Sequence, residues 1–434
     1  MSVRSTFKST LIIVNRCLYG EGMSTMTARE AAKRMGVKVE TLYAYVSRGL
    51  LESHTAADGR TSAFDARSIE ELARRGRPRQ SSRSSSLNML IETAITSLSP
   101  QGVRYRGRLS TDLAREHTFE DVAELLWTGT LGERTHGWVG ETLSPIGGDA
   151  LDLHDAVRVA AARAAIGRAN IGHGAPPDVA GTGRHLIATI TDSLPIIGGS
   201  RSPRLTLPDG SGPFRATIAG RLWTRLSPQR PAPGMLAALN AALVLMADHE
   251  LAASTLAVRV AASTRADPYA VVNTGLGALS GSLHGAASRL TRALIDHALE
   301  VGPVRAINSS IRAGQRLPGF GHKVYLDADP RAAALLDLLR RAAPNSRALA
   351  VIDELGSIAA ERIGREPNVD FALAAMSVVG RMPAEGGETV MSIARIAGWL
   401  AHAQEEYGEA PLRFRPRASY IGPPPCHSSA EPLR

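Results

Sequence analysis

The sequence predicts an all-α protein built from two or three domains. Alanine and leucine dominate it and only 4% of its residues are aromatic, a composition that favours helices over sheets. Apolar residues recur at helical spacing in most segments after residue 150, and no segment alternates for long like a half-buried strand. A chain of 434 residues also exceeds the usual size of a single hydrophobic core.

Residues 1–25 show no periodicity, and we expect them to be disordered and to carry no function. Basic charge is concentrated at this end of the chain. Residues 1–86 carry 15 Lys and Arg against 8 Asp and Glu, and the whole chain has a formal net charge of +9. A segment of this kind suits a nucleic acid or another polyanion, although a solvated basic face is the commoner explanation.

Residues 26–75 are predicted to form a small DNA-binding module. The segment Thr27–Val37 has the pattern of a capped helix: Thr27 and Glu30 form a capping box, and the helix closes at a glycine. A second helix is expected over Lys38–Leu50 after a short turn, which is the pattern of a helix-turn-helix.

Gly59-Arg60 is then expected at the tip of a small wing, and Phe64–Arg75 as a closing helix. Altogether the module resembles the MerR or excisionase type of winged helix-turn-helix, whose second helix enters the major groove of DNA. The resemblance places possible DNA contacts at Lys38, Thr41, Tyr43, Tyr45 and Arg48. The alternative is a helical appendage used for dimer contacts or regulation.

A polar, low-complexity linker is expected over residues 76–86, since it cannot bury a core. Residues 196–216 are rich in Gly, Pro and Ser and are expected to form a loop. Helical spacing appears over Leu151–Ile166, Pro233–Ala262, Pro268–Leu279, Arg289–Glu300, Pro330–Ala343, Arg347–Ile363, Val369–Val379 and Thr389–Tyr407.

The stretch with the richest chemistry is residues 317–325, Leu-Pro-Gly-Phe-Gly-His-Lys-Val-Tyr, followed by Asp329-Pro330-Arg331. Its glycines let the backbone fold tightly beside a ligand, and a loop that leads into the start of a helix suits anion binding. Taken by itself, the stretch could equally be an ordinary loop with a packed histidine.

Three other motifs accompany it: Ala247-Asp248-His249-Glu250, Leu283-His284-Gly285 and Pro367-Asn368-Val369-Asp370-Phe371. In this order and combination they resemble the citrate synthase family. The resemblance implies two helical domains with a catalytic cleft between them. Their expected bounds are 87–280 with 382–425 for the large domain, 281–381 for the small domain and 426–434 for a tail.

The resemblance implies condensation of acetyl-CoA with oxaloacetate and hydrolysis to citrate and CoA, a step of the tricarboxylic acid cycle. It makes Asp370 the base that removes the weakly acidic methyl proton. It makes His284 the donor that stabilises the enol, and His322 the donor to the ketone of oxaloacetate.

By the same resemblance a set of cationic or donor side chains holds the dicarboxylate, because the fork of arginine matches a carboxylate. The set is His249, Arg331, Arg395 and Arg415. The family supplies the last arginine from a neighbouring subunit, which implies at least a homodimer. The residues expected to contact CoA are Leu317, Gly319, Gly321 and Lys323. No metal is expected, and no cofactor beyond the acyl-CoA co-substrate.

Three positions depart from the family's pattern. Ala286 follows the His-Gly pair where the family commonly has a second glycine, and Leu326 stands where a basic residue can meet a CoA phosphate. Ala372 follows Asp370-Phe371 where the family often continues with Tyr-Ser-Gly. These differences bear on CoA affinity and on the shape of the acyl pocket rather than on the chemistry.

Two rival functions stay open at this point. One is 2-methylcitrate synthase, which uses propionyl-CoA. The other is a transcription regulator whose citrate synthase-like body senses a tricarboxylate or an acyl-CoA. Asp370 and both catalytic-type histidines favour an enzyme, because a pure sensor needs the arginines but not the base.

Other classes find little support in the sequence. None of the four lysines stands in a Gly-Lys-Ser/Thr motif, which excludes a P-loop. Cys17 and Cys426 have no metal-ligand spacing, and we expect a protein of the reducing cytoplasm. The apolar run Leu11–Val14 is too short to cross a membrane.

Overall fold

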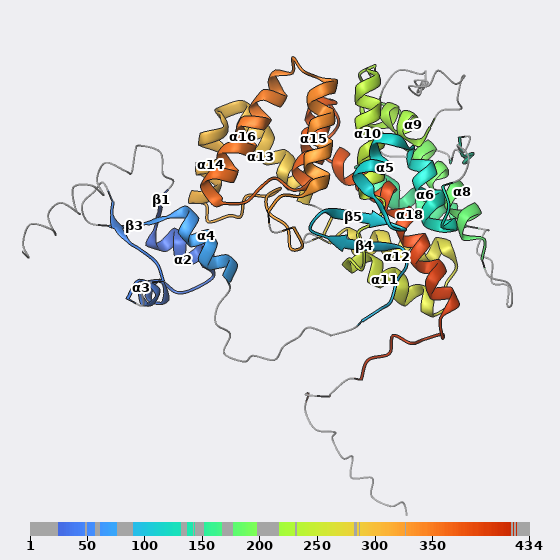
Figure 1. The fold of residues 1–434 in the computed structure, drawn as a ribbon, viewed down its shortest axis with the longest axis horizontal. Helices are drawn as coiled ribbons and strands as arrows, with labels where there is room; N and C mark the ends of the chain where they lie inside the picture. Colours follow the sequence, from blue (N-terminus) through green and yellow to red (C-terminus); the bar gives the residue numbers. More distant parts are fainter. Residues whose placement is uncertain are drawn as a thin grey trace, which may run out of the picture.

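The computed structural model describes residues 25–47, 50–56, 61–75, 90–131, 137–141, 143, 152–166, 177–197, 217–230, 232–281, 284–285, 287–325, 327–417, 420 and 422. Residues 1–24, the linker, the wing tip Gly59-Arg60 and most of the predicted loop 196–216 lie outside this description. Helices dominate the described part, as expected (Figure 1).

Residues 25–75 form an N-terminal module of three helices and a small sheet. The three strands pair antiparallel in the order β1-β3-β2, so the first strand lies beside the third. The elements are β1 (Thr25–Thr27), α2 (Ala28–Met35), α3 (Val39–Ser47), β2 (His54–Thr55), β3 (Ser62–Asp65) and α4 (Ala66–Arg75). Phe64, expected in the closing helix, is a fully buried strand residue instead.

The cap predicted for the first helix of the module is present. The Thr27 hydroxyl accepts from the Glu30 backbone N–H, the Glu30 carboxylate accepts from the Thr27 N–H, and Gly36 ends the helix at φ 63°. The capping box and the left-handed glycine satisfy backbone groups that the helix ends leave unpaired. The turn to α3 therefore follows from local sequence.

A second three-stranded sheet begins the body of the protein and was not predicted. It consists of β4 (Thr96–Ser99), β5 (Gly102–Tyr105) and β6 (Arg108–Leu109), paired antiparallel in that order. Its strands have two to four residues, too few to show an alternation in the sequence. The turn between β5 and β6 places Arg106 at φ 47° and Gly107 at φ 85°, the backbone of a tight hairpin.

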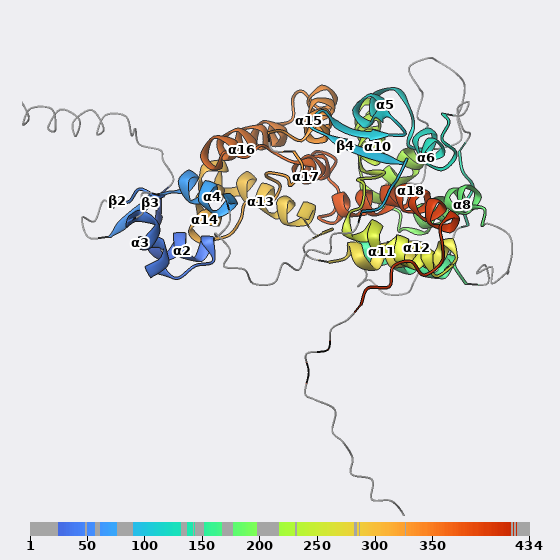
Figure 2. The same ribbon diagram turned by 60° about the horizontal axis from the view of Figure 1, so that its bottom comes forward.

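Two groups of helices make up the rest of the body. The first comprises α5 (Ser110–Glu116), α6 (Phe119–Thr128), α7 (Leu153–Ala164), α8 (Val179–Ser193), α9 (Ile218–Leu226), α10 (Pro233–Met246), α11 (Ala253–Ser263), α12 (Pro268–Leu279) and α18 (Gly386–Gly408). The second comprises α13 (Ala287–Val301), α14 (Pro303–Arg312), α15 (Pro330–Ala342), α16 (Arg347–Ile363) and α17 (Val369–Val379). The α13–α17 group stands between the N-terminal module and the first group (Figures 1 and 2).

Helix α18 is the centre of the first group. It contacts α6, α7, α8, α10, α11 and α12, and also α13 and α17 of the second group. Every residue from Gly386 to Ala403 is buried, so the helix has no solvent-exposed face over that length. A helix that is buried all round belongs in the middle of a large core.

The predicted helix Pro233–Ala262 is divided in the structure. Helix α10 stops at Met246 and α11 starts at Ala253, and Glu250 between them takes a left-handed φ of 55°. The break places Asp248 and His249 on a loop instead of a helix face. A continuous apolar pattern could not reveal it, because both helices share one buried environment.

The N-terminal module rests on the α13–α17 group through two basic side chains. Lys33 of α2 donates from Nζ to the carbonyl of Ala313, which ends α14, at 3.2 Å. Arg67 of α4 lies beside Gly364, which ends α16. Both cations therefore sit at the carbonyl ends of helices, where the helix dipole favours positive charge. Helices α2 and α4 accordingly lie next to α14 and α16 (Figure 2).

None of the helices in the described part of the chain is long and apolar enough to cross a membrane.

Candidate active site

The loop 317–325 and the start of α17 are tied together by backbone hydrogen bonds. Asn368 donates from its backbone N–H to Gly319 O at 2.9 Å and from its side-chain amide to Gly321 O at 2.9 Å. Its side-chain oxygen caps α17 by accepting from the N–H groups of Asp370 and Phe371. One asparagine therefore fixes the position of Asp370 relative to the loop that carries His322.

Gly319 and Gly321 give this loop its shape. Both have positive φ, 84° and 72°, and a Cβ on Gly319 would lie 2.5 Å from Cγ2 of Thr291. A side chain at Gly319 would be strained in its backbone and in collision with α13. The two glycines thus let the loop run flat against the helices that flank it.

His322 is held in one tautomer. Its Nδ1 accepts from the backbone N–H of Val324 at 3.0 Å and of Tyr325 at 3.4 Å. An atom that accepts cannot carry the ring proton, so the neutral imidazole bears it on Nε2. Burial, followed by the charge of Arg331, lowers the pKa of His322 below its ordinary value. The ring is therefore a neutral donor through Nε2.

His284 is held through its Nε2 atom, whereas His322 is held through Nδ1. Its Nε2 lies 2.8 Å from the Ser254 hydroxyl, and that hydroxyl accepts from the indole N–H of Trp399 at 3.3 Å. With the indole proton directed at its oxygen, Ser254 gives its own proton to His284 Nε2, which leaves the ring proton on Nδ1. Burial and then Arg395 lower the pKa of His284, so this ring too is a neutral donor.

Asp370 has the electrostatics of a general base. Burial, the largest cause, raises its pKa to about 6, while Arg331 and Arg395 oppose the rise and Asp329 supports it. A carboxylate with a pKa this close to neutral is ionised at pH 7 but retains more basicity than an exposed aspartate. The group can therefore accept a proton from carbon better than a surface carboxylate could.

Arg331 and Arg395 are both buried, at 2% exposure each. Asp329 binds Arg331 through two hydrogen bonds, from Nε at 3.0 Å and Nη2 at 2.9 Å, which leaves the Nη1 protons for another partner. Arg395 donates from Nε to the carbonyl of Met246 at 2.9 Å. Each guanidinium is thus anchored on one side by the protein.

His249 and Tyr325 carry polar atoms that lack a partner among the described residues. His249 Nε2 and the Tyr325 hydroxyl are both buried without a hydrogen bond, and the rings of His249 and His322 lie 5.2 Å apart, edge to face. Burial and then Arg331 lower the pKa of His249. Buried polar atoms without partners are rare and call for a ligand or water. Both atoms therefore have the capacity for a further hydrogen bond.

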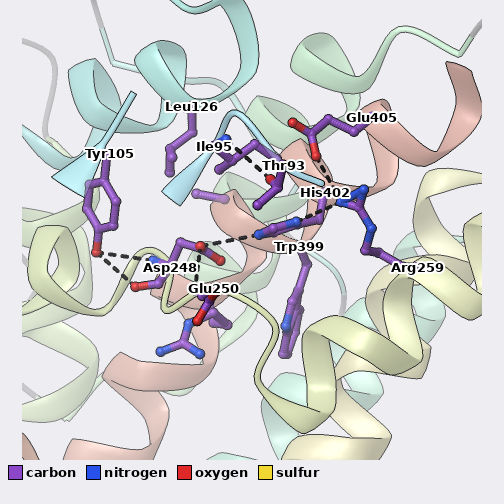
Figure 3. Close-up of polar contacts among 12 residues, drawn as sticks. Thr93, Ile95, Tyr105, Leu126, Asp248, Glu250, Arg259, Trp399, His402 and Glu405 are labelled. Atoms are coloured by element: carbon purple, nitrogen blue, oxygen red, sulfur yellow. Dashed lines mark hydrogen bonds and ion pairs between the residues drawn. The ribbon is translucent and has the colours of Figure 1, made fainter. Parts of the chain in front are cut away.

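A buried polar chain supports the loop that carries His249. Asp248 contacts His402 of α18, with 3.3 Å between Oδ2 and Nε2, and His402 Nδ1 accepts from Arg259 of α11 at 2.9 Å (Figure 3). Arg259 in turn donates to Glu405 at 2.9 Å. Burial would raise the pKa of Asp248, but His402 and Arg395 outweigh it and keep the pKa below its ordinary value.

Tyr105 of β5 holds the same loop from the opposite side (Figure 3). Its hydroxyl lies 3.1 Å, 3.2 Å and 3.0 Å from the carbonyl oxygens of Val244, Leu245 and Asp248, and it accepts from the Asp248 N–H at 3.2 Å. The unpredicted sheet thus has a clear role, because it brings this hydroxyl to the end of α10.

Six of the predicted site residues lie close enough together that the charges of some shift the pKa values of others. These are His249, His284, His322, Arg331, Asp370 and Arg395. Arg415 is exposed on the segment after α18. Of the residues predicted to contact CoA, Leu317, Gly321 and Lys323 line a cavity of about 420 Å³, whereas Gly319 faces Thr291 and Phe371.

The residues predicted to contact DNA differ in how far their side chains are exposed to solvent. Lys38, just before α3, and Tyr43 on α3 are exposed, and Thr41 is half-buried. Tyr45 is a correction: it is only 7% exposed because its ring packs in the core of the module, so it is unsuited to a DNA contact. Arg48 lies outside the described residues.

Sequence reasoning missed the residues that orient the predicted ones. Ser254, Trp399, His402 and Tyr105 act through contacts across long sequence distances. One signal was available, because Arg395, Trp399 and His402 are four and seven positions apart and so share one face of a helix. Within the described ranges no cluster of His, Cys, Asp and Glu could hold a metal ion.

The sequence of this chain is similar to those of known proteins. A family model described as the C-terminal domain of citrate synthase matches residues 179–417. The citrate synthase of Haloferax volcanii is 30% identical over 344 residues, which cover 73% of this chain and 89% of that protein. Citrate synthase 2 of Bacillus subtilis is 34% identical over 213 residues, 48% of this chain and 56% of that protein. The chain thus spans about half the length of this second relative.

Solved structures share the fold. The citrate synthase of Thermotoga maritima superposes with a TM-score of 0.59 at 24% identity, over 78% of this chain and 95% of that one. A citrate synthase of Thermoplasma acidophilum, solved in ternary complex with carboxymethyl coenzyme A and oxaloacetate, gives 0.59 at 23% identity, over 77% and 94%.

Proposed function

This chain belongs to the citrate synthase family, and from that premise we propose that it condenses acetyl-CoA with oxaloacetate and hydrolyses the product to citrate and CoA. One observation carries the proposal. Two neutral histidines, each with its ring proton directed by the protein, share their surroundings with an aspartate whose pKa is raised to about 6. Condensation needs such a base together with two donors.

The proposed first step is proton removal from the acyl methyl group. Asp370 takes the proton, and the Nδ1–H of His284 donates to the thioester oxygen on which negative charge develops. A neutral donor suits this task, because its N–H binds the enolate without first losing a proton to the carboxylate.

The second proposed step forms the carbon–carbon bond. The enol carbon attacks the ketone of oxaloacetate, and the Nε2–H of His322 donates to the ketone oxygen as it becomes an alkoxide. Water then cleaves the thioester of the resulting citryl-CoA, which breaks the C–S bond and releases CoA as its thiol.

The proposed site for the dicarboxylate is the group of Arg331, Arg395 and His249. The Nη1 protons of Arg331 and the unpartnered Nε2 of His249 supply contacts that the protein itself does not use. Arg415 is proposed to complete the site of a neighbouring subunit. This accounts for its exposure on a single chain and makes a homodimer the active form.

We also propose a division of the body into two domains, with α13–α17 as the small domain over residues 281–381. Relative motion of the two would close the site and exclude water during condensation. Asp370 and His322 then belong to the small domain, and His249 and Arg395 to the large one.

The test is release of free thiol by the purified protein with oxaloacetate and acetyl-CoA. We expect steady release, and a loss of about 10³-fold in kcat for Asp370→Asn, which keeps the shape of the side chain but removes the base. Propionyl-CoA in the same assay separates citrate synthase from 2-methylcitrate synthase. The difference between the two acyl groups is a single methylene, worth roughly 1–3 kcal/mol.

Stability supplies the control for that substitution. Because the pKa of Asp370 is raised from 3.8 to about 6 in the folded protein, its ionisation costs stability as the pH rises between these two values, and the full cost is present above pH 6. Asp370→Asn should therefore keep or gain stability at pH 8, by about 1–3 kcal/mol. Equal thiol release by the variant and the parent chain would exclude Asp370 as the base.

A second proposed role is DNA binding by the N-terminal module as a winged helix-turn-helix. The observation that favours it is the exposure of Lys38, at the turn before α3, and of Tyr43 on α3 itself, after the sharp turn at Gly36. The full chain should bind duplex DNA with an affinity that falls as salt is added, and Lys38→Glu should weaken binding on all sequences. Failure of the chain to bind DNA at low salt would make the module a docking domain.

A further inference from the structure

The loop 317–323 opens into a cavity that the N-terminal module helps to enclose. Its volume is about 420 Å³, in the range of ligand sites. One wall comes from the α13–α17 group, including Leu317 and His322, and the facing wall from Arg34, Glu70 and Ala73 of α2 and α4. A cavity with walls from two parts of the chain exists only while those parts are docked.

The cavity is strongly basic. Arg316, Lys323 and Arg365 line it from the body, and the only acidic lining side chain, Glu70, is engaged in a two-pronged ion pair with Arg34. Both members of this pair are below 10% exposure, so its charges are balanced inside the module. The charged lining residues that the body contributes are all basic, and a cavity lined in this way suits a polyanion.

The lining is also apolar where it meets the candidate active site. Phe320 and Leu317 lie in the cavity beside His322, and Ile363 lies at the end of α16. A ligand that fits has a flat or flexible apolar part, several negative charges, and a reactive end near His322. A CoA thioester has these three properties together.

Two of the contacts that dock the module involve basic side chains at helix ends. Lys33 and Arg67 sit at the carbonyl ends of α14 and α16, and a cation at such a place is worth about 0.3–1 kcal/mol. A ligand that fills the cavity favours the docked arrangement, since a ligand stabilises whichever state it binds better. The cavity thus couples the position of the module to ligand occupancy.

We propose that the N-terminal module forms the outer wall of the acyl-CoA site, with the phosphate-bearing part of CoA lying between Ala73 and the basic loop side, so that acyl-CoA holds the module docked. The proposal rests on the condensation proposed above for the substrate class, and adds a part of the chain that the citrate synthase fold does not include. Acyl-CoA then becomes a signal for the module as well as a substrate.

Ala73 allows a matched test in the full chain, because it lines the cavity from α4 and is only partly buried. Ala73→Glu places a negative charge in the cavity, and Ala73→Gln adds the same bulk without charge. Binding of CoA, measured by calorimetry at low salt, should be about three- to tenfold weaker in the glutamate variant than in the glutamine variant, as expected for one like charge in a solvated cavity. The KM for acetyl-CoA should rise by the same factor while kcat stays unchanged.

Hydrogen exchange of the parent chain gives a second readout that needs no variant. CoA should slow amide exchange in α4, Ala66–Arg75, as well as in the loop 315–323. Protection of the loop without protection of α4, or equal CoA affinity of the two variants, would overturn the proposal. A chain that binds CoA and protects α4 but releases no thiol would overturn the condensation and leave this proposal standing, whereas turnover with equal KM in the two variants would do the reverse.

Discussion

The structure contains two kinds of histidine, one fully buried and one partly buried. His402 of α18 uses both ring nitrogens on protein partners, Asp248 and Arg259. His322 and His284 each use one nitrogen on the protein, and within the described part of the chain the other nitrogen has no partner. The difference separates a histidine that supports the scaffold from one that is proposed to bind a substrate.

The strongest test of this comparison is to replace one histidine of each kind with leucine. His322→Leu removes the Nε2–H proposed to bind the ketone, and kcat should fall about 10²- to 10³-fold, the usual effect of losing one such donor. Its thermal unfolding should change little, because the ring is only partly buried. Thiol release and a melting curve on the same preparation check both statements.

Ser254→Ala sharpens the comparison at His284. Without the hydroxyl, nothing holds the ring proton on Nδ1, and kcat should drop on the order of tenfold to thirtyfold. Ser263→Ala is the matched control, since its hydroxyl bonds only to a backbone carbonyl of the same helix. Similar activities of the two variants would show that the tautomer of His284 does not depend on Ser254.

The pH profile tests the third member of the site. Since burial raises the pKa of Asp370 to about 6, the carboxylate form is lost as the pH falls through 6, and kcat/KM should be about tenfold lower at pH 5 than at pH 7. The rate measured at a series of pH values should follow one ionisation in this range. A profile that stays flat down to pH 5 would place the base elsewhere.

His402→Leu should have the smallest effect on turnover. The substitution leaves Asp248 and Arg259 without their shared partner in a fully buried place, so the free energy of unfolding should fall by about 2–4 kcal/mol. For the molecules that remain folded, kcat should stay within about threefold. Denaturant unfolding together with the activity per folded molecule measures both quantities.

The predicted helices agree best with the structure where a capping residue marks the start of the helix. Helices α12, α16 and α17 have the predicted bounds, and each starts after a side-chain cap, Asp267, Ser346 and Asn368 respectively. Helices α5, α8, α9 and α14 were not predicted. The split between α10 and α11 could not be found, since the hydroxyl of Tyr105 and the backbone carbonyl of Asp248 that stabilise it are 143 positions apart.

The candidate site also has a part that local motifs could predict and a part that they could not. The motifs identified every side chain proposed to touch the substrates, because each stands in a short local pattern. They could not identify Ser254 or Trp399, which set the proton of His284, since a serine and a tryptophan in two apolar helices show no local pattern. The cavity wall from α4 was also beyond prediction, because it depends on where the module docks.

Gly398 lies where α18 passes the loop after α10. A Cβ at this position would lie 2.3 Å from Oδ1 of Asp248, and the Gly398 N–H donates to Ala247 O at 3.0 Å. The loop that carries His249 therefore takes its shape only when it packs against α18. This helix is synthesised after every other helix that it contacts. Pairing of residues so far apart in sequence is slow to form. We therefore expect the nascent chain to expose the apolar faces of α6–α12 until α18 arrives, and synthesis at high level to depend on chaperones that hold this intermediate.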